Sequence, residues 1–201
     1  MKAVLLSCLL FFGFAFAGSE KEKAEALFNA AILSSANYES AIKAEDAFTQ
    51  LDKENPSFYN KIRMATLIAV KAKHSSIFKK KGLADDSVKA FETLEPYIQE
   101  TNKAEDIYEF HFFRGRTYSN FPSFLGKAET AKQDLDMAVR MVRGGLVNNR
   151  PTAETARLFA SYGKVLINEG KKSEGITFLK EAFESGTLEG EDLEFAQKHL
   201  N

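Results

Sequence analysis

Apolar residues recur at intervals of three and four along almost the whole chain after residue 20, which is the spacing of amphipathic helices. Alternating runs of Val, Ile and Thr are absent, and so are the Asn-Gly and Asp-Gly pairs typical of β-hairpins. The pattern therefore predicts an all-α protein. The expected helices cover approximately residues 20–32, 38–51, 57–72, 84–98, 107–118, 127–141, 153–168, 172–185 and 191–200.

The second helix of each expected pair carries the same short pattern. A small residue is followed four positions later by an apolar residue, and three positions after that by another. The small residues are Ala44, Ser87, Ala131 and Gly175, at spacings of 43, 44 and 44 residues. A small side chain lets two helices approach closely, so the recurrence predicts four stacked helical hairpins, with the final short helix as a cap. The full sets are Ala44/Phe48/Leu51, Ser87/Phe91/Leu94, Ala131/Leu135/Ala138 and Gly175/Leu179/Ala182.

The fourth hairpin resembles a tetratricopeptide repeat. Its first helix has two large residues, a glycine and then a Leu where that motif has Tyr, and its second helix has the motif's small and apolar residues at the correct intervals. These residues are Phe159, Tyr162, Gly163, Leu166, Gly175, Leu179 and Ala182.

The other three hairpins match less completely. The third places His111 and Arg114 at large apolar positions of the motif and has four extra residues in its turn. The second is weak and has a still longer turn. A period of 44 residues also exceeds the usual repeat of about 34, so HEAT or armadillo units are the alternative fold. The matching residues are Gly115, Tyr118, Ala131, Leu135 and Ala138 in the third hairpin, and Ala44, Phe48 and Pro56 in the first.

The resemblance also implies a binding surface. In tetratricopeptide arrays the first helix of each pair lines a concave groove that commonly receives peptides or extended segments of partner proteins. Three cations on that face, Arg116, Arg157 and Lys164, would make it locally basic and suited to an acidic segment; ordinary surface charge is the alternative. The groove residues implied for the third and fourth copies are Phe112, Phe113, Arg116, Ser119, Asn120, Arg157, Ala160, Ser161, Lys164 and Asn168.

Two further segments are candidates for surface contacts. Lys79–Lys81 is a basic run in a predicted turn. We expect it either to be a solvated tip or to contact anionic lipid or an acidic partner. The segment 121–125 is an apolar insertion in the third turn. Its residues Phe121 and Phe124 either pack on a neighbouring hairpin or form an exposed lip for a partner.

Composition excludes several classes of function. The chain has 27 Lys plus Arg against 28 Asp plus Glu, which argues against a nucleic-acid binder with a dominant basic field. One Cys and three widely separated His exclude a disulfide scaffold and a Cys-based zinc module. Neither a phosphate-binding glycine loop nor a G-x-S-x-G motif is present. We therefore expect no cofactor, no metal and no catalytic residues.

Residues 1–17 have the form of a Sec-type signal peptide. Lys2 precedes an apolar run, and Ala15-Phe16-Ala17 has the small residues of a cleavage site. The expected mature chain is then one repeat domain, 18–201, without Cys or N-glycosylation sites, which fits a periplasmic protein, with a secreted one as the alternative. A retained anchor and a lipoprotein at Cys8 are less favoured readings.

Taken together, these patterns predict a protein that acts by binding another protein or a peptide. The expected role is an adaptor in an envelope assembly, secretion or transport system. The alternative is a small-ligand-binding or transporter-accessory protein of the periplasm. We expect no nucleic-acid partner and no stable membrane span after signal cleavage.

Overall fold

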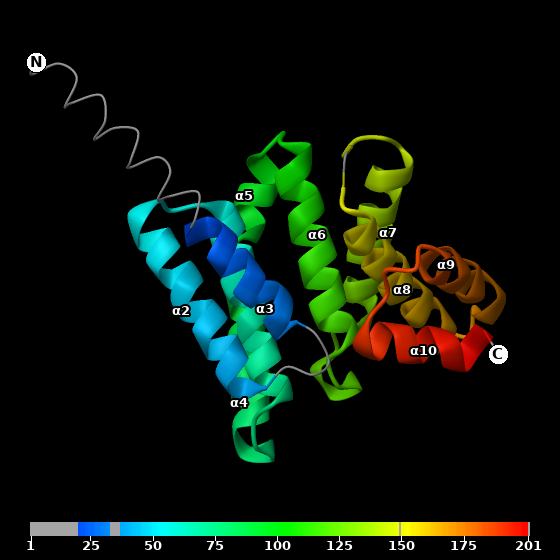
Figure 1. The fold of residues 1–201 in the computed structure, drawn as a ribbon, viewed down its shortest axis with the longest axis horizontal. Helices are drawn as coiled ribbons and strands as arrows, with labels where there is room; N and C mark the ends of the chain where they lie inside the picture. Colours follow the sequence, from blue (N-terminus) through cyan, green and yellow to red (C-terminus); the bar gives the residue numbers. More distant parts are fainter. Residues whose placement is uncertain (1–19, 33–36, 149, 201) are drawn as a thin grey trace, which may run out of the picture.

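The computed structural model describes residues 20–32, 37–148 and 150–200, and every regular element in these ranges is a helix (Figure 1). This confirms the all-α prediction. The expected signal peptide, 1–17, lies outside the described residues. None of the helices in the described ranges is long and apolar enough to cross a membrane. The elements are a first helix (residues 20–31), α2 (Tyr38–Glu54), α3 (Phe58–Lys73), α4 (Ile77–Glu92), α5 (Glu95–Glu100), α6 (Ala104–Ser119), the 3-10 helix η1 (Ser123–Leu125), α7 (Ala128–Arg143), α8 (Thr152–Asn168), α9 (Lys172–Glu184) and α10 (Gly190–Leu200).

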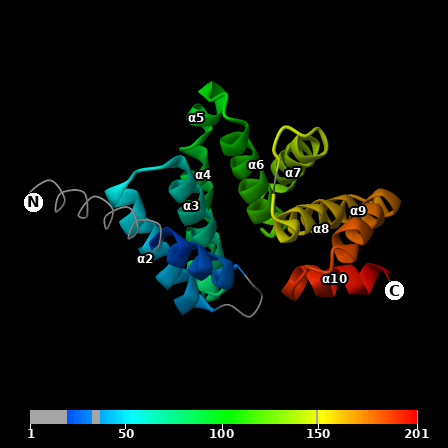
Figure 2. The same ribbon diagram turned by 45° about the horizontal axis from the view of Figure 1, so that its top comes forward.

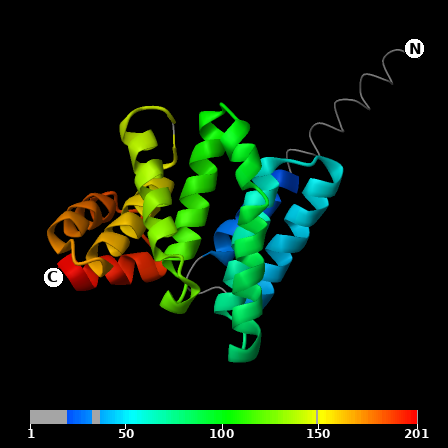
Figure 3. The ribbon, with the colours of Figure 1, turned by 180° about the vertical axis from the view of Figure 1, so that it is seen from behind.

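The helices pack mainly as sequential pairs. α3 packs on both α2 and α4, α6 packs on α7, and α8 packs on α9. Contacts of α3 with α6 and of α7 with α8 join these groups into one arc, which Figures 1 and 3 show from opposite sides. α10 departs from the sequential order, because it crosses back over α8 and α9 instead of extending the arc.

Two of the recurrent small residues, Ser87 and Gly175, lie at close contacts between paired helices. In the pair α3–α4, Ser87 is buried and its Oγ donates a hydrogen bond to the Ala65 carbonyl at 2.8 Å. In the pair α8–α9, a Cβ on Gly163 would lie 2.8 Å from the Gly175 carbonyl oxygen, and a Cβ on Gly175 would lie 2.6 Å from that of Gly163. The expected close approach is therefore present in these two pairs.

Two apolar clusters form the core. The larger runs from the first helix to α9 and is rich in aromatic rings, including edge-to-face contacts of Phe28 with Phe48 and Phe113. The smaller lies between α8, α9 and α10 and includes Ala160, Leu179 and Ala196. Phe159 packs against both clusters, so α10 is attached to the same core as the arc.

The expected helix from about residue 84 to 98 is wrong at both ends. α4 begins at Ile77, so Lys79–Lys81 lies inside a helix and not in a turn. The first two turns of α4 are mostly exposed and need no apolar stripe, which is why periodicity missed them. Pro96 stands at the start of α5, where it has no N–H for the preceding helix and separates α4 from α5.

Candidate functional site

Two adjoining pockets lie on the face formed by the first helix, α3, α6, α8 and α10. Their volumes are about 270 Å³ and about 450 Å³. We call them the first and the second pocket, and together the groove. The first is bordered by the start of α10, which lies on the same side of the molecule as the first helix (Figure 2). The pockets share four lining residues, which join them into one surface: Ile32, Phe113, Arg116 and Arg157.

The structure brings only part of the expected groove residues into this surface. Arg116 and Arg157 line both pockets, and so does Phe113. Phe112 lines the second pocket and Asn120 the first. The two phenylalanines are almost fully buried in the core, so they contribute apolar wall and are not free to reach a partner.

The remaining expected residues lie away from both pockets. Ser161 is 3 % exposed and lines neither pocket, and Ala160 belongs to the cluster shared with α10. α10 thus covers part of the α8 face that the resemblance assigns to a groove. Lys164 instead donates a hydrogen bond to Asn120 Oδ1 at 2.8 Å. Ser119 and Asn168 also line neither pocket.

The expected apolar lip divides into two parts. Phe121 stacks on Tyr118 of its own hairpin with ring centroids 5.5 Å apart and lines the first pocket. Phe124, on η1, is 70 % exposed, as the lip interpretation predicts.

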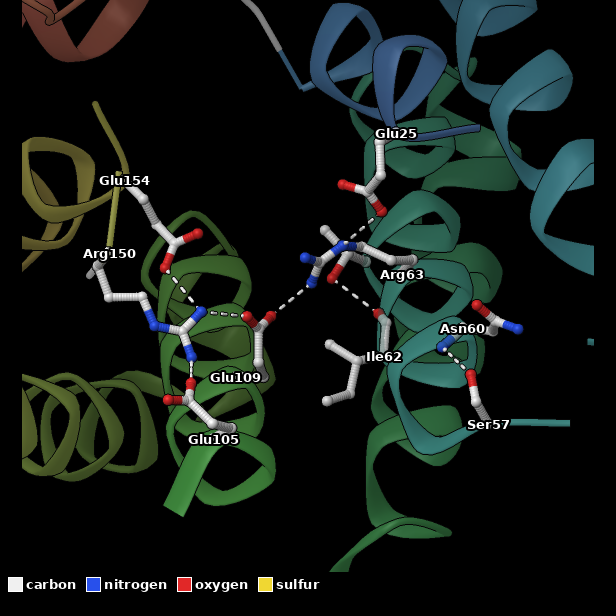
Figure 4. A network of polar contacts seen from close by, with 10 residues as sticks. Glu25, Ser57, Asn60, Ile62, Arg63, Glu105, Glu109, Arg150 and Glu154 are labelled. Atoms are coloured by element: carbon white, nitrogen blue, oxygen red, sulfur yellow. Dashed lines mark hydrogen bonds and ion pairs between the residues drawn. The ribbon is translucent and has the colours of Figure 1, made fainter. Parts of the chain in front are cut away.

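A buried network of charged side chains forms one wall of the second pocket (Figure 4). Arg63 of α3 is 4 % exposed, and its Nη1 donates to Glu109 Oε2 at 2.7 Å. Glu109 Oε1 accepts from Arg150 Nη1, also at 2.7 Å. Arg150 also pairs with Glu154 and Glu105, and Arg63 Nε lies 3.6 Å from Glu25 Oε1. This Arg63–Arg150 network ties the first helix, α3, α6 and the start of α8 together.

Aromatic rings enclose both guanidinium groups of this network. The Arg63 guanidinium carbon lies 4.0 Å from the centre of the Phe113 ring and 4.1 Å from that of Tyr59. That of Arg150 lies 4.4 Å from the Tyr108 ring. A planar guanidinium can stack on a ring while its N–H groups bond at the edge, which an ammonium cannot do. Positions 63 and 150 therefore need the planar shape of arginine as well as its positive charge.

Burial dominates the electrostatics of the network. It raises the pKa of Glu109, helped by repulsion from Glu154 and Glu25, while Arg63 acts in the opposite direction. Burial also lowers the pKa of Arg150, although Glu154 opposes this. For Arg63, the attraction of Glu109 and Glu25 outweighs burial and raises its pKa. The network holds its charges only because each has a partner.

Acidic residues at the start of α10 pair with cations at the ends of α3 and α6. Lys73 Nζ lies 2.7 Å from Glu191 Oε1, and Arg116 Nη2 donates to Asp192 Oδ2 at 2.9 Å. These pairs hold α10 at the edge of the first pocket. They also occupy Arg116, one of the cations expected to bind a partner. The groove as a whole is balanced in charge, because Arg63, Lys73, Lys80, Arg116, Arg150 and Arg157 are offset by Glu25, Glu109, Glu154, Glu189, Glu191 and Asp192.

Arg157 differs from the other groove cations. It lies at the junction of the two pockets, and within the described part of the chain no carboxylate oxygen is within 4.0 Å of its guanidinium nitrogens. Burial lowers its pKa, and so does the neighbouring Arg116, while Glu189 and Asp192 oppose both from farther away. Arg157 therefore presents an incompletely neutralised positive charge to the groove.

A second buried cluster explains where the third hairpin departs from the tetratricopeptide pattern. Arg114 donates two hydrogen bonds to Asp134 of α7, from Nε at 2.6 Å and from Nη2 at 2.8 Å. His111 Nδ1 lies 2.7 Å from Asp134 Oδ1. His111 and Arg114 are thus interhelix residues satisfied by one buried carboxylate. None of the three lines either pocket.

Sequence reasoning missed the Arg63–Arg150 network, although a signal was present. Glu109 stands inside the otherwise apolar and aromatic run of residues 107–113, where a carboxylate needs a buried partner. Arg63 likewise follows the buried Ile62 on an apolar face. No group of three His, Cys, Asp or Glu side chains in the described ranges is arranged to hold a metal ion.

The docking of α10 is expected to weaken in acid. The hydrogen bond from Lys73, with further help from the charges of Lys73, Lys164 and His74, lowers the pKa of Glu191 below 4.5 against the opposing effect of burial. A carboxyl with a lowered folded pKa stabilises the fold above its ordinary pKa, and this stabilisation is lost as pH falls through the folded value. Because both partners are about half exposed, the expected effect is less than about 1 kcal/mol.

Hydrogen–deuterium exchange, corrected for the intrinsic pH dependence, would measure this. Amides of α10 should lose protection relative to those of α7 as pH falls below 4.5, and Glu191→Gln should remove that relative change. Glu39→Gln is the control, because Glu39 also has a lowered pKa but pairs with Lys43 on the distant helix α2. A Glu191→Gln protein with the wild-type pH profile would contradict the role given to this ion pair.

A comparison of the chain with protein-family models, with curated proteins and with solved structures finds no match. Any function proposed for it therefore depends on the groove itself.

Proposed function

We propose that this protein is an exported adaptor that binds an extended segment of a partner protein in the groove. The observation that carries the proposal is Arg157, a cation at the junction of two pockets without a carboxylate partner in the described part of the chain. An acidic side chain or a terminal carboxylate of the partner would complete the charge balance there. Charge-assisted bonds from a guanidinium to a carboxylate are strong and directional.

A tetratricopeptide-like stack of hairpins is part of the proposal. Its support is that the first helix of each expected pair contributes to the groove: Glu25 and Phe28 from residues 20–31, Thr66 from α3, Phe113 from α6 and Arg157 from α8. In further support, the small residues of the second helices Ala44, Ser87 and Ala131 are fully buried, and Gly175 contacts α8 closely.

The walls of the groove suit a chain segment of mixed character. Phe113 and Phe121 give apolar surface in the first pocket, while Arg157 offers hydrogen-bond donors beside it. A site that combines apolar walls with a few placed polar groups gives both affinity and orientation. We infer binding without chemistry of its own, in an envelope assembly, secretion or transport system.

Removal of the Arg157 charge is expected to weaken binding of acidic peptides at least about tenfold, the effect of losing one charge-assisted contact. The probes are fluorescein-labelled ten-residue peptides, each made with Asp or Glu at defined positions and again with Asn or Gln there. Fluorescence polarisation would compare the wild type with Arg157→Gln.

Arg140→Gln is the matched control, because Arg140 is exposed on α7 and lines neither pocket. The preference for the acidic peptides should survive in Arg140→Gln and disappear in Arg157→Gln. Equal affinities for Arg157→Gln and the wild type would refute the proposed anchor.

One observation favours a small ligand as the second candidate. Part of the wall of the first pocket is apolar and includes Val70, Ala84 and Phe121, and the start of α10 bounds the pocket. Native mass spectrometry of protein purified from its own cells would separate the two functions. A retained lipid or solute, lost in a Val70→Asp protein that keeps its circular dichroism, would favour the small ligand.

A further inference from the structure

The start of α4 is the most exposed apolar point of the described chain. Ile77 is 80 % exposed and Phe78 is 94 % exposed, and no other large apolar residue in the described ranges exceeds either value. Both lie in the first turn of α4, at the end of the molecule that projects farthest beyond the neighbouring helices in Figures 1 and 3. Nothing in the described part of the chain covers them.

Three lysines follow these apolar residues directly. Lys79, Lys80 and Lys81 are all exposed, and because successive helical residues are about 100° apart they spread over more than half of the helix circumference. Lys81 pairs with Asp85 one turn later, and Lys80 borders the first pocket. Lys79 has no carboxylate within 4.0 Å among the described residues. We call residues 77–81 the α4 tip.

The lysines are not explained by the stability of α4. A helix start favours acidic residues and a side-chain cap. α4 has no acidic residue in its first turn, and Ser76 makes no capping hydrogen bond. Cations at this end of a helix oppose its dipole. The α4 tip departs from these local preferences and also exposes two large apolar side chains. This combination indicates that the tip contacts another molecule.

The arrangement matches the boundary of a lipid bilayer. At such a boundary the apolar side chains of the α4 tip can lie below the lipid headgroups. The long lysine side chains can then keep their ammonium groups at the level of the phosphates. Phe124, on η1 two residues after the pocket residue Pro122, is a second exposed apolar residue close in the chain to the first pocket.

We propose that the α4 tip docks the protein on anionic membrane surfaces, with Ile77 and Phe78 inserted at the interface and Lys79–Lys81 on the lipid phosphates. This goes beyond partner binding and does not depend on it. Because Lys80 and Phe121–Pro122 line the first pocket, docking would place one end of the groove next to the bilayer. The groove could then take its partner at the membrane surface.

Sedimentation with vesicles tests the proposal. The protein is purified from the cells that express it, and mass spectrometry establishes its N-terminus. It is then mixed with vesicles of phosphatidylcholine alone or with vesicles that also contain phosphatidylglycerol, whose negative charge attracts basic segments. We expect binding to the anionic vesicles only, weakened by salt. Lys79→Gln/Lys80→Gln/Lys81→Gln should lower the partition coefficient about a hundredfold, since each of the three lysines contributes about fivefold.

Two control variants make the same change in total charge or in apolar side chains at positions away from the α4 tip. Lys171→Gln/Lys172→Gln/Lys180→Gln removes the same charge from exposed positions on or next to α9 and should leave binding within about twofold, since their charge is not at the docking surface. Phe78→Ser should weaken binding, whereas Leu146→Ser, at another exposed apolar residue, should not. Equal losses in both lysine triples, or an unchanged Phe78→Ser protein, would overturn the proposal.

Fluorescence gives an independent readout, because the chain has no Trp. Phe78→Trp should shift its emission to the blue on anionic vesicles and be quenched by brominated acyl chains, while Leu146→Trp should do neither. An acidic protein partner predicts a different result, in which poly-glutamate changes the emission of the Phe78→Trp protein and vesicles do not. That outcome would overturn membrane docking.

Discussion

Gly163→Leu is expected to lower the melting temperature by about 10 °C or more, which corresponds to roughly 3 kcal/mol for a chain of this size. Any side chain at position 163 places its Cβ 2.8 Å from the Gly175 carbonyl oxygen and 3.1 Å from Leu179 Cγ. The first of these atoms is backbone, so α9 itself must move away from α8. Thermal unfolding followed by circular dichroism measures the effect.

The same substitution at Gly82 is the control. Gly82 lies within α4, and a Cβ there would meet nothing within 4 Å. Gly82→Leu should therefore leave the melting temperature unchanged or raise it slightly, because Leu favours a helix by up to about 1 kcal/mol over Gly. Similar melting curves for the two variants would show that α8 and α9 do not depend on the close approach at Gly163.

Removal of one carboxylate from the Arg63–Arg150 network should destabilise the protein almost as strongly. Glu109→Leu leaves Arg63 and Arg150 buried without their shared partner, and breaking a buried ion pair in this way costs about 3–5 kcal/mol. The further change Arg63→Met should recover part of the loss, because it removes one of the uncompensated charges. Urea denaturation of the two single variants and the double variant would give the coupling energy.

Glu39→Leu provides the surface comparison. Glu39 pairs with Lys43 at 2.8 Å, but both side chains are largely exposed, and water screens such surface pairs so that they add little to stability. If Glu109→Leu were no more destabilising than Glu39→Leu, the network would not be holding the first helix, α3 and α6 together.

Local sequence patterns anticipated most of the helices and the places where they touch. Residues 153–168 and 172–185 were expected as a pair, and the structure has α8 and α9 there with Gly163 against Gly175. Such features are local, because a helix needs only its own periodicity and a close approach needs only a small residue. The start of α4 at Ile77 escaped prediction because an exposed helix end has no apolar face to reveal it.

The groove was predictable only in part, since it depends on contacts between distant segments. Arg116 and Arg157 were expected to face it and do line it. Ser161 was expected there too, but it is buried on α8, a helix on which α10 packs. No periodicity within α8 indicates that α10 will fold back. Similarly, the pairing of Arg63 with Glu109 joins residues that are 46 positions apart in the sequence. The only sequence signal for this pair was that each charged residue stands among apolar neighbours.

The return of α10 across the arc affects how the protein unfolds. In a linear stack each hairpin touches only its neighbours, so stability adds along the chain and the two ends can melt separately. Here Asp192 is paired with Arg116, 76 residues earlier, and Glu191 is paired with Lys73 of α3. Loosening either end thus removes contacts from the other. The last helix is therefore attached directly to α3 and α6 as well as to its neighbour α9, and its position at the edge of the groove depends on contacts with segments much earlier in the chain.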